Sequence, residues 1–397
     1  MTEESLPLGY QFAGVACGIK DDPTTKDLAL IVSDRDSAAV GVFTTNRVKA
    51  APVLWCQDRL PATDVRGIVV NSGNANACTG ERGRRDAQRM AQRLATALGA
   101  NDSQVLVGST GVIGHPLPIE IIESGIDSAA KRLERSSASL ELAARAIMTT
   151  DTRPKLSRRT LTLAGGAVTV LGIAKGAAMI GPNMATMLSY IMTDAVAGPD
   201  LLEPVLRQAV DRSFHCISVE GHTSTNDTVL LLANGATGVA VDNEEQGLFE
   251  AAVTEVACEL SRAIIDDAEG ASHVITLDVR GCRTEAEART IAKEIADSAL
   301  VKTAVFGNDP NWGRIVSAAG YAGVAFEETE VSLRVNGTLL YDHGVPTPFD
   351  ADAESKRMKD SRETHLELDL ESGDARCRFW TSDLTHDYVH LNADYTT

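Results

Sequence analysis

The sequence predicts a layered α/β fold, an α+β sandwich in which several strands and helices alternate along the chain. Apolar runs with strand character are interleaved with amphipathic segments of helical period, which is typical of layered architectures. A chain of 397 residues exceeds what one small hydrophobic core organises, so more than one structural unit is expected. We find no internal repeat and no low-complexity tract that would indicate a solenoid or a disordered linker.

In the first part of the chain, short apolar runs predict strands at residues 28–32, 40–43, 67–71 and 105–108. Apolar side chains at helical spacing predict a helix over residues 84–98, and Gly99 suits its end. A second helix is expected from about residue 139 to residue 148. Residues 159–173 predict a hairpin that turns at Gly165 and Gly166.

The second part begins with a predicted strand at residues 187–192. Helices are expected at 201–214, with Asp200 as N-cap, at 244–265, and after Thr284, where Glu287 completes a capping box. Further strands are expected at 227–232, 274–279, 302–306, 331–335, 366–370 and 376–380. Residues 340–364, with two prolines and mixed charge, predict an exposed excursion.

Composition restricts the class of partner. The net charge of −18 argues against a nucleic-acid surface, which requires basic patches. The densest basic stretch, residues 82–93, is interpreted as the solvated face of a helix. No apolar run approaches the roughly 18 residues that span a membrane, and the N-terminus does not resemble a signal peptide.

The seven cysteines are widely spaced and form no CxxC pair, a pattern typical of reduced cytoplasmic proteins. The eight histidines show no metal-ligand spacing. His386 and His390 are four residues apart but are expected in a strand-like tail. We therefore expect a cytoplasmic protein without a metal, without nucleic acid and without a membrane anchor.

The junction of Ala185 and Thr186 is the most informative position. A loop rich in Gly and Ala leads directly into the apolar strand at 187–192, and a small residue before a threonine at such a place can be a self-cleavage site. The Thr186 hydroxyl would attack the Ala185 carbonyl, and hydrolysis of the ester would make Thr186 a new N-terminus. Its α-amine, with a pKa of about 7.7–8.0, can then activate its own hydroxyl. The alternative is an ordinary strand threonine.

An ordered set of motifs resembles the ornithine acetyltransferase family. The run Lys175 to Leu188 resembles the self-cleaving loop of that family. The other blocks keep the family's order: 71–80 (NSGNANACTG), 109–114 (STGVIG), 148–152 (MTTDT), 223–228 (TSTNDT), 309–314 (DPNWGR) and 391–397 (LNADYTT). A single block has little weight, but the whole ordered set is specific.

The resemblance implies an α-chain of residues 1–185 and a β-chain of residues 186–397, intertwined in one fold and assembled as a heterotetramer of two α and two β chains. It implies acetyl transfer from N-acetyl-L-ornithine to L-glutamate through an acetyl-Thr intermediate. No cofactor is required, although some relatives accept acetyl-CoA as a co-substrate.

The resemblance also assigns roles to residues. Thr186 is the nucleophile, and Thr110 and Gly111 form the oxyanion pair. The substrate contacts are Thr149, chosen over Thr150, together with Lys175, Glu269, Asn392 and Thr397. A lysine suits a substrate carboxylate, and an acid suits the ornithine ammonium.

Three positions depart from the family pattern: Ala178 replaces a common Gly, His222 lies where an Asp-rich stretch is usual, and His273 replaces a frequent Lys. These departures bear on substrate preference. The alternatives are an aminopeptidase or amidohydrolase with an N-terminal nucleophile, an acetyltransferase recruited to secondary metabolism, and a binding protein with a degenerate site.

Overall fold

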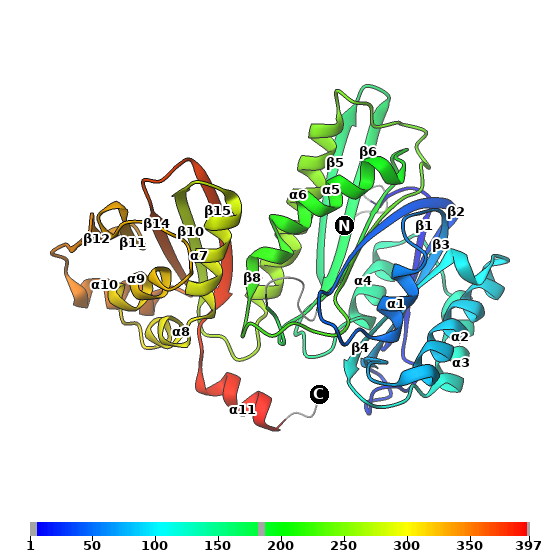
Figure 1. The fold of residues 1–397 in the computed structure, drawn as a ribbon. Coiled ribbons are helices and arrows are strands. Elements are labelled where there is room, and N and C mark those ends of the chain that lie inside the picture. Colours follow the sequence, from blue (N-terminus) through cyan, green and yellow to red (C-terminus); the bar gives the residue numbers. More distant parts are fainter. Residues whose placement is uncertain (1–5, 182–186, 395–397) are drawn as a thin grey trace.

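The computed structural model describes residues 6–181 and 187–394. The ribbon shows two lobes, a larger one built around the first sheet and a smaller one built around the second (Figure 1). The C-terminal helix runs below the junction of the lobes (Figure 1). The predicted α/β class is confirmed.

The first sheet has eight strands, in the order β4-β3-β2-β9-β7-β6-β5, with β1 paired to β2. Its strands are β1 (Tyr10–Val15), β2 (Leu28–Phe43), β3 (Ala62–Asn74), β4 (Val105–Val112), β5 (Lys155–Leu163), β6 (Gly166–Lys175), β7 (Leu188–Thr193) and β9 (Thr228–Ala233). Strands β7 and β9 lie between β2 and β6, so residues before and after the junction at 185–186 share one sheet.

The middle strands of this sheet are buried on both faces. In β7, Tyr190 and Met192 belong to one apolar core, whereas Ile191 belongs to another on the opposite face. Such strands have continuous apolar runs rather than alternating ones. This explains the consecutive apolar residues at 190–192 in β7 and at 229–233 in β9.

The sheet also curls back on itself. Strands β4 and β7 are four positions apart in the sheet order, about 19 Å in a flat sheet at 4.8 Å per strand. Yet Gly108 of β4 lies directly against the Tyr190 hydroxyl of β7. The long strand β2 lies between them, and its pairing with β3 shifts register between Val32 and Ala39, just before it pairs with β9. Strands on distant positions of the sheet therefore face each other.

Helices cover the larger lobe on two sides. Helices α1 (Ala51–Gln57), α2 (Gly80–Leu98), α3 (Ile119–Ala130) and α4 (Ser137–Ala146) pack against β1–β4. Helices α5 (Pro199–Asp211) and α6 (Gln246–Asp266) pack against each other and against β2, β5 and β6.

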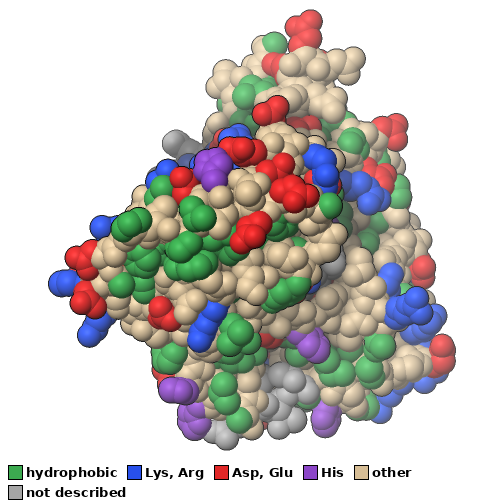
Figure 2. Space-filling model, turned by 60° about the vertical axis from the view of Figure 1, so that its left-hand side comes forward, with side chains coloured by type: hydrophobic (Ala, Val, Ile, Leu, Met, Phe, Trp, Pro, Cys, Tyr) green, Lys and Arg blue, Asp and Glu red, His purple; other side chains and the backbone are tan. Residues whose placement is uncertain are grey.

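The smaller lobe has a seven-stranded sheet in the order β13-β12-β11-β14-β10-β15-β8. Its strands are β8 (Ile217–Ser218), β10 (Val274–Cys282), β11 (Ser332–Val335), β12 (Thr338–Asp342), β13 (Val345–Pro346), β14 (Glu363–Asp369) and β15 (Ala375–Ser382). The helices are α7 (Glu285–Asp297), α8 (Ala299–Phe306), α9 (Trp312–Gly320) and α10 (Ala351–Asp360), followed by α11 (His386–Asp394). Figure 2 shows acidic and basic side chains interspersed on one face of the molecule.

Most predicted elements are confirmed, with the strands at 28–32 and 40–43 joined in β2. The basic stretch lies on α2, where Arg89 and Arg93 pair with acids of α3. Thr284 is the N-cap of α7 and accepts a hydrogen bond from the Glu287 N–H. None of the described helices combines the length and apolarity of a membrane span.

Four local predictions are wrong in full or in part. Residues 302–306 form part of α8, which Ser298 caps by accepting a hydrogen bond from the Val301 N–H, so helix capping prevails over strand-like composition. The expected excursion at 340–364 is mostly exposed, but it is not irregular: it contains the end of β12, β13 and α10, whose Glu354 and Met358 are buried. Gly198 rather than Asp200 is the N-cap of α5, since Pro199 starts the helix. His386 lies in α11, packed edge-on against Phe306, and not in a strand.

We predict that Gly281→Ala destabilises the protein more than Gly238→Ala. Both glycines have a positive φ, +74° and +73°, so each alanine carries backbone strain of about 1–3 kcal/mol. Only at Gly281 would the new Cβ overlap a neighbour, the Leu370 carbonyl oxygen. Urea unfolding followed by circular dichroism measures both, and equal losses would contradict the packing argument.

Candidate functional site

A small cavity lies where the ends of β4 and β6 approach each other. It encloses about 110 Å³. Six residues that the sequence singled out line it together: Thr110, Gly111, Thr149, Lys175, Glu269 and Asn392. Thr150 and the described loop residues Ala178 and Met179 complete much of its wall. The structure therefore brings residues from across the chain to one place.

Thr110 and Gly111 lie at the end of β4, beside β3. Gly111 has φ +132°, and a Cβ there would overlap the backbone of Gly73. The β3–β4 ladder shifts register at Gly73 and Asn74, so the strand is irregular at this point. Only glycine fits this position, where the irregular strand lines the cavity together with Thr110.

Lys175 ends β6 and is 1% exposed. Its Nζ donates to the Thr110 Oγ1 at 3.3 Å. Burial lowers the pKa of this ammonium, although Asp151 opposes the effect. Because a hydroxyl has one proton to donate, a Thr110 oxygen that accepts from Lys175 keeps that proton for a third partner.

A buried charge cluster supports Lys175 from behind. Asp151 accepts from Lys155 Nζ at 2.6 Å and from the Gly176 N–H at 2.6 Å. Lys155 also donates to Asp267 at 2.7 Å. Burial acts to raise the pKa of Asp151, but the charges of Lys175 and Lys155 outweigh it and hold the pKa at about 2. The cluster links the residues after α4 to β5, β6 and the end of α6.

Glu269 and Asn392 meet at the other side of the cavity. The Asn392 Nδ2 donates to the Glu269 carboxylate at 3.2 Å. Helix α11, which carries Asn392, is fixed through the Thr385 hydroxyl, which donates to the Gly270 carbonyl at 2.6 Å. Both Thr149 and Thr150 line the cavity, so the geometry does not choose between them.

The self-cleavage residues Ala185 and Thr186, and the predicted contact Thr397, lie outside the described residues. The next described residue, Met187, donates its N–H to the Asp227 Oδ1 at 3.1 Å. Asp227 is fully buried, and burial raises the pKa of its carboxyl well above the usual range. On the other side, the Ile180 carbonyl accepts the N–H groups of Val219, Glu220 and Gly221.

A second, more open cavity of about 590 Å³ shares Thr150 and Glu269 with the first. Arg153 and Arg362 stand on its wall. A ligand with one end in the small cavity could therefore place its larger part in the second cavity.

Sequence reasoning missed several polar residues around the site. Asn226 donates to the carbonyls of Ala75 and Ser109 and so ties two loops to the cavity wall. Its motif was recognised, but no role was assigned to it. The Asp151–Lys155–Asp267 cluster was also missed, because nothing local in the sequence marks Lys155 as buried in a strand that also carries Arg158 and Arg159.

The three departures have different positions. Ala178 lines the cavity. His222 is exposed and does not line it. His273 is buried and bonds to Asp383 at 3.1 Å, which raises the pKa of the imidazole. His273 thus belongs to the packing between β10 and the segment after β15.

One group could hold a metal by distance alone. Ligand atoms of Asp278, His365 and Glu367 lie within 4.8 Å of one another. Asp278 is already held by Arg378 at 2.7 and 2.8 Å. Burial acts to raise the pKa of the Asp278 carboxyl, but the hydrogen bonds and charges of Arg378 and His365 outweigh burial and hold this pKa at about 2. A guanidinium occupying both oxygens favours an ion-pair cluster over a cation site.

Comparison with known proteins extends over the whole chain. The model of the ArgJ family matches residues 11–397. The chain is 47% identical over 392 residues to the arginine biosynthesis bifunctional protein ArgJ of Geobacter sulfurreducens, covering 98% of this chain and 99% of that protein. It is 45% identical over 402 residues to the protein of the same name from Thermotoga neapolitana, covering 99% and 100%. The crystal structure of ArgJ from Bacillus halodurans matches with a TM-score of 0.51 and 32% identity, covering 53% of this chain and 100% of that one.

We predict that Asp151→Asn lowers the free energy of unfolding by about 3–5 kcal/mol, because it leaves Lys155 and Lys175 buried without this carboxylate. The matched control Glu203→Gln breaks an exposed pair with Arg207 and should cost less than about 1 kcal/mol. The pKa of Asp151 falls from 3.8 to about 2 on folding, so its stabilisation is present above pH 4 and is lost as the pH falls toward 2. Urea unfolding at pH 7 and pH 3 tests both statements, and a loss that is the same at both values would contradict the second.

Proposed function

Because the chain belongs to the ArgJ family, we propose that it transfers an acetyl group from N-acetyl-L-ornithine to L-glutamate in arginine biosynthesis. Family membership confirms the resemblance drawn from the ordered motifs. The observation that carries the proposal is the single cavity in which Thr110, Gly111 and Lys175 meet Glu269 and Asn392.

The first chemical step is self-cleavage. The Thr186 hydroxyl attacks the Ala185 carbonyl, the Ala185–Thr186 amide bond breaks, and an ester links the two residues. Water hydrolyses the ester, which leaves a carboxylate on Ala185 and a free α-amine on Thr186. Asp227, bonded to the N–H of Met187, supports this mechanism because it fixes the peptide that follows the new terminus.

Acetyl transfer then proceeds in two halves, as is typical of a covalent nucleophile. The α-amine of Thr186 takes the proton of its hydroxyl, whose oxygen attacks the acetyl carbonyl of N-acetylornithine. The amide bond breaks, ornithine leaves with that proton, and the acetyl group remains on Thr186. The amine of glutamate attacks this ester, releases N-acetylglutamate and restores the threonine.

Thr110 and Gly111 are suited to hold the oxyanion in each half. Lys175 donates to the Thr110 oxygen at 3.3 Å, which directs the Thr110 proton away from the lysine. The positive φ of Gly111 places the backbone close to Gly73 beside the cavity. Donors fixed before the reaction stabilise the developing charge without reorganisation.

Substrate recognition follows from the charges on the wall. The Glu269 carboxylate, which already accepts from Asn392, suits the ornithine ammonium. Buried Lys175 and the threonine hydroxyls suit a carboxylate. Because the described cavity measures about 110 Å³, it suits a small acyl amino acid.

Acetyl-CoA is proposed as a second donor. The relatives from Geobacter sulfurreducens and Thermotoga neapolitana are named bifunctional proteins. The adjoining cavity of about 590 Å³ gives room for a leaving group larger than ornithine. We also propose that the two fragments remain paired, since β7 and β9 lie within the sheet of the first fragment. The assembly of two α and two β chains and its place in the cytoplasm are proposed from the family resemblance.

We predict that the purified protein consists of fragments of 185 and 212 residues, divided between Ala185 and Thr186. Thr186→Ala should remain one chain because it lacks the hydroxyl, whereas Thr186→Ser keeps a hydroxyl and should still cleave. Intact-mass spectrometry distinguishes the three. An uncut wild-type chain would sink the proposed mechanism.

We predict that Thr110→Val lowers kcat for acetyl exchange by about 10²–10³, the usual effect of losing one oxyanion donor. The control Thr303→Val changes an exposed threonine of α8 and should leave kcat unchanged. The assay follows N-acetylglutamate and free acetate together in protein shown to be cleaved. Acetate without N-acetylglutamate would favour the hydrolase alternative.

A further inference from the structure

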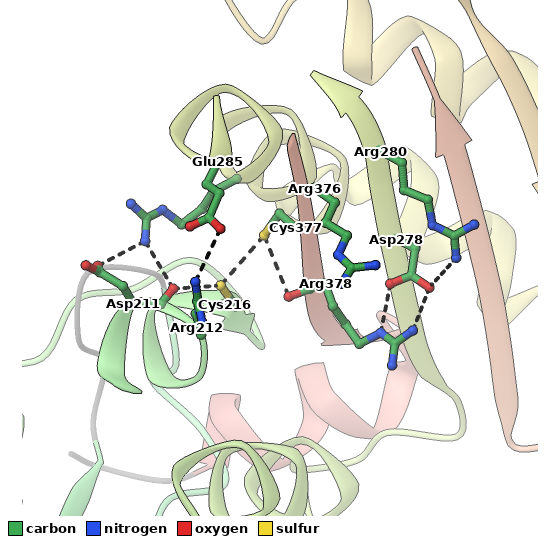
Figure 3. Close-up of a pocket in the computed structure, with 10 residues that line it drawn as sticks. Asp211, Arg212, Cys216, Asp278, Arg280, Glu285, Arg376, Cys377 and Arg378 are labelled. Carbon is green, nitrogen blue, oxygen red and sulfur yellow. Dashed lines mark hydrogen bonds and ion pairs between the residues drawn. The ribbon is translucent and has the colours of Figure 1, made fainter. Parts of the chain in front are cut away.

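A larger cavity of about 650 Å³ lies apart from the proposed active site, between α5, α7 and the strands β10 and β15. No residue that lines it also lines the two cavities near Thr150. Figure 3 shows charged side chains from several elements around two sulfur atoms. None of the side chains that line this cavity has a role in the acetyl transfer proposed above.

Basic groups outnumber acidic groups on the wall. Five arginines stand against three carboxylates in a chain whose net charge is −18; the arginines are Arg212, Arg280, Arg289, Arg376 and Arg378. Four of the five are paired: Arg378 and Arg280 with Asp278, Arg289 with Asp211, and Arg212 with Glu285. Arg376 has no ion pair within the described ranges, and in Figure 3 no dashed line reaches it. The cavity is therefore suited to an anionic small molecule.

Two thiols meet beside these arginines. The Sγ atoms of Cys216 and Cys377 are 3.7 Å apart although the residues are separated by 161 positions. Cys216 ends the turn after α5 and is buried, whereas Cys377 of β15 is partly exposed. The Cys216 thiol holds the pKa of Cys377 below the ordinary thiol range, and Arg289 acts in the same direction against burial. Of the two sulfurs, Cys377 is the more reactive one, since the thiolate is the nucleophile.

We propose that Cys377 and Cys216 form a thiol–disulfide exchange site that reacts with small anionic disulfides bound among the arginines of this cavity. The Cys377 thiolate attacks one sulfur of the reagent, the reagent's S–S bond breaks, and one thiolate leaves. The Cys216 thiol gives up its proton and attacks the Cys377 sulfur, which releases the second thiolate. Two protein thiols are oxidised to a disulfide, and one small disulfide is reduced to two thiols.

The test uses reduced protein with Cys78→Ser, which removes an exposed thiol outside the cavity. Oxidised glutathione serves as the anionic reagent and cystamine as the cationic one. Peptide mass mapping should find Cys216 linked to Cys377 and restored by dithiothreitol. Thiol titration should show faster oxidation by glutathione disulfide than by cystamine at the same concentration.

Variants separate the roles of the groups. Cys216→Ser should stop at a stable glutathione adduct on Cys377, because the resolving thiol is gone. Arg376→Gln should slow oxidation by glutathione disulfide about two- to fourfold, the effect of one charge at a solvated distance. The control Arg93→Gln changes an arginine of α2 that pairs with Asp127 of α3 and does not line this cavity, so it should not change the rate.

The proposal fails if no Cys216–Cys377 peptide forms, or if cystamine reacts as fast as glutathione disulfide. Arg376 is exposed, so its variant remains informative even where a cysteine variant does not fold. Acetyl exchange in reduced protein is measured in parallel and should be unaffected by Arg376→Gln. A loss of exchange without oxidation would contradict the separation of the two sites.

Discussion

The attraction between the buried Asp151 carboxylate and two lysines is the interaction on which the site depends. The carboxylate lies between these lysines, Lys155 and Lys175, and also accepts the N–H of Gly176. Without this negative charge, Lys155 would keep only its pair with Asp267, and the buried Lys175 that donates to Thr110 would lose its main compensating charge. The cluster fixes the end of β6, and with it Lys175. Because Lys175 donates to the Thr110 oxygen, the Thr110 hydroxyl keeps its own proton for the proposed oxyanion.

The curl of the first sheet is the second constraint. Thr110 on β4 and Lys175 on β6 are five positions apart in the sheet order, about 24 Å in a flat sheet. These two side chains nevertheless bond directly, and β2, whose pairing with β3 shifts register, lies between β4 and β6 in the sheet order.

Sequence periodicity predicted the elements whose burial is regular. The central strands β7 and β9 and the amphipathic helix α2 have patterns that alone determine their type. Prediction failed where a single polar residue decides the outcome. Ser298 caps α8 inside an apolar run, and Asp350 caps α10 by accepting from the Ala353 N–H. The oxyanion pair and the substrate contacts are predicted from the resemblance alone, whereas the Asp151 cluster forms only when distant elements pack, which no local pattern records.

The order of strands has a consequence for how the molecule holds together. Strands β7 and β9 are inserted between β2 and β6. The antiparallel ladder between β6 and β7 runs up to the pair of Lys175 and Leu188, so it does not include the connection between these strands. A break in that connection would remove no ladder hydrogen bond. Separation of the two halves would instead tear one sheet along two edges, β2–β9 and β6–β7, and expose both apolar cores to water. The integrity of the protein therefore resides in strand pairing rather than in covalent continuity, as in a permuted or split protein whose pieces reassemble.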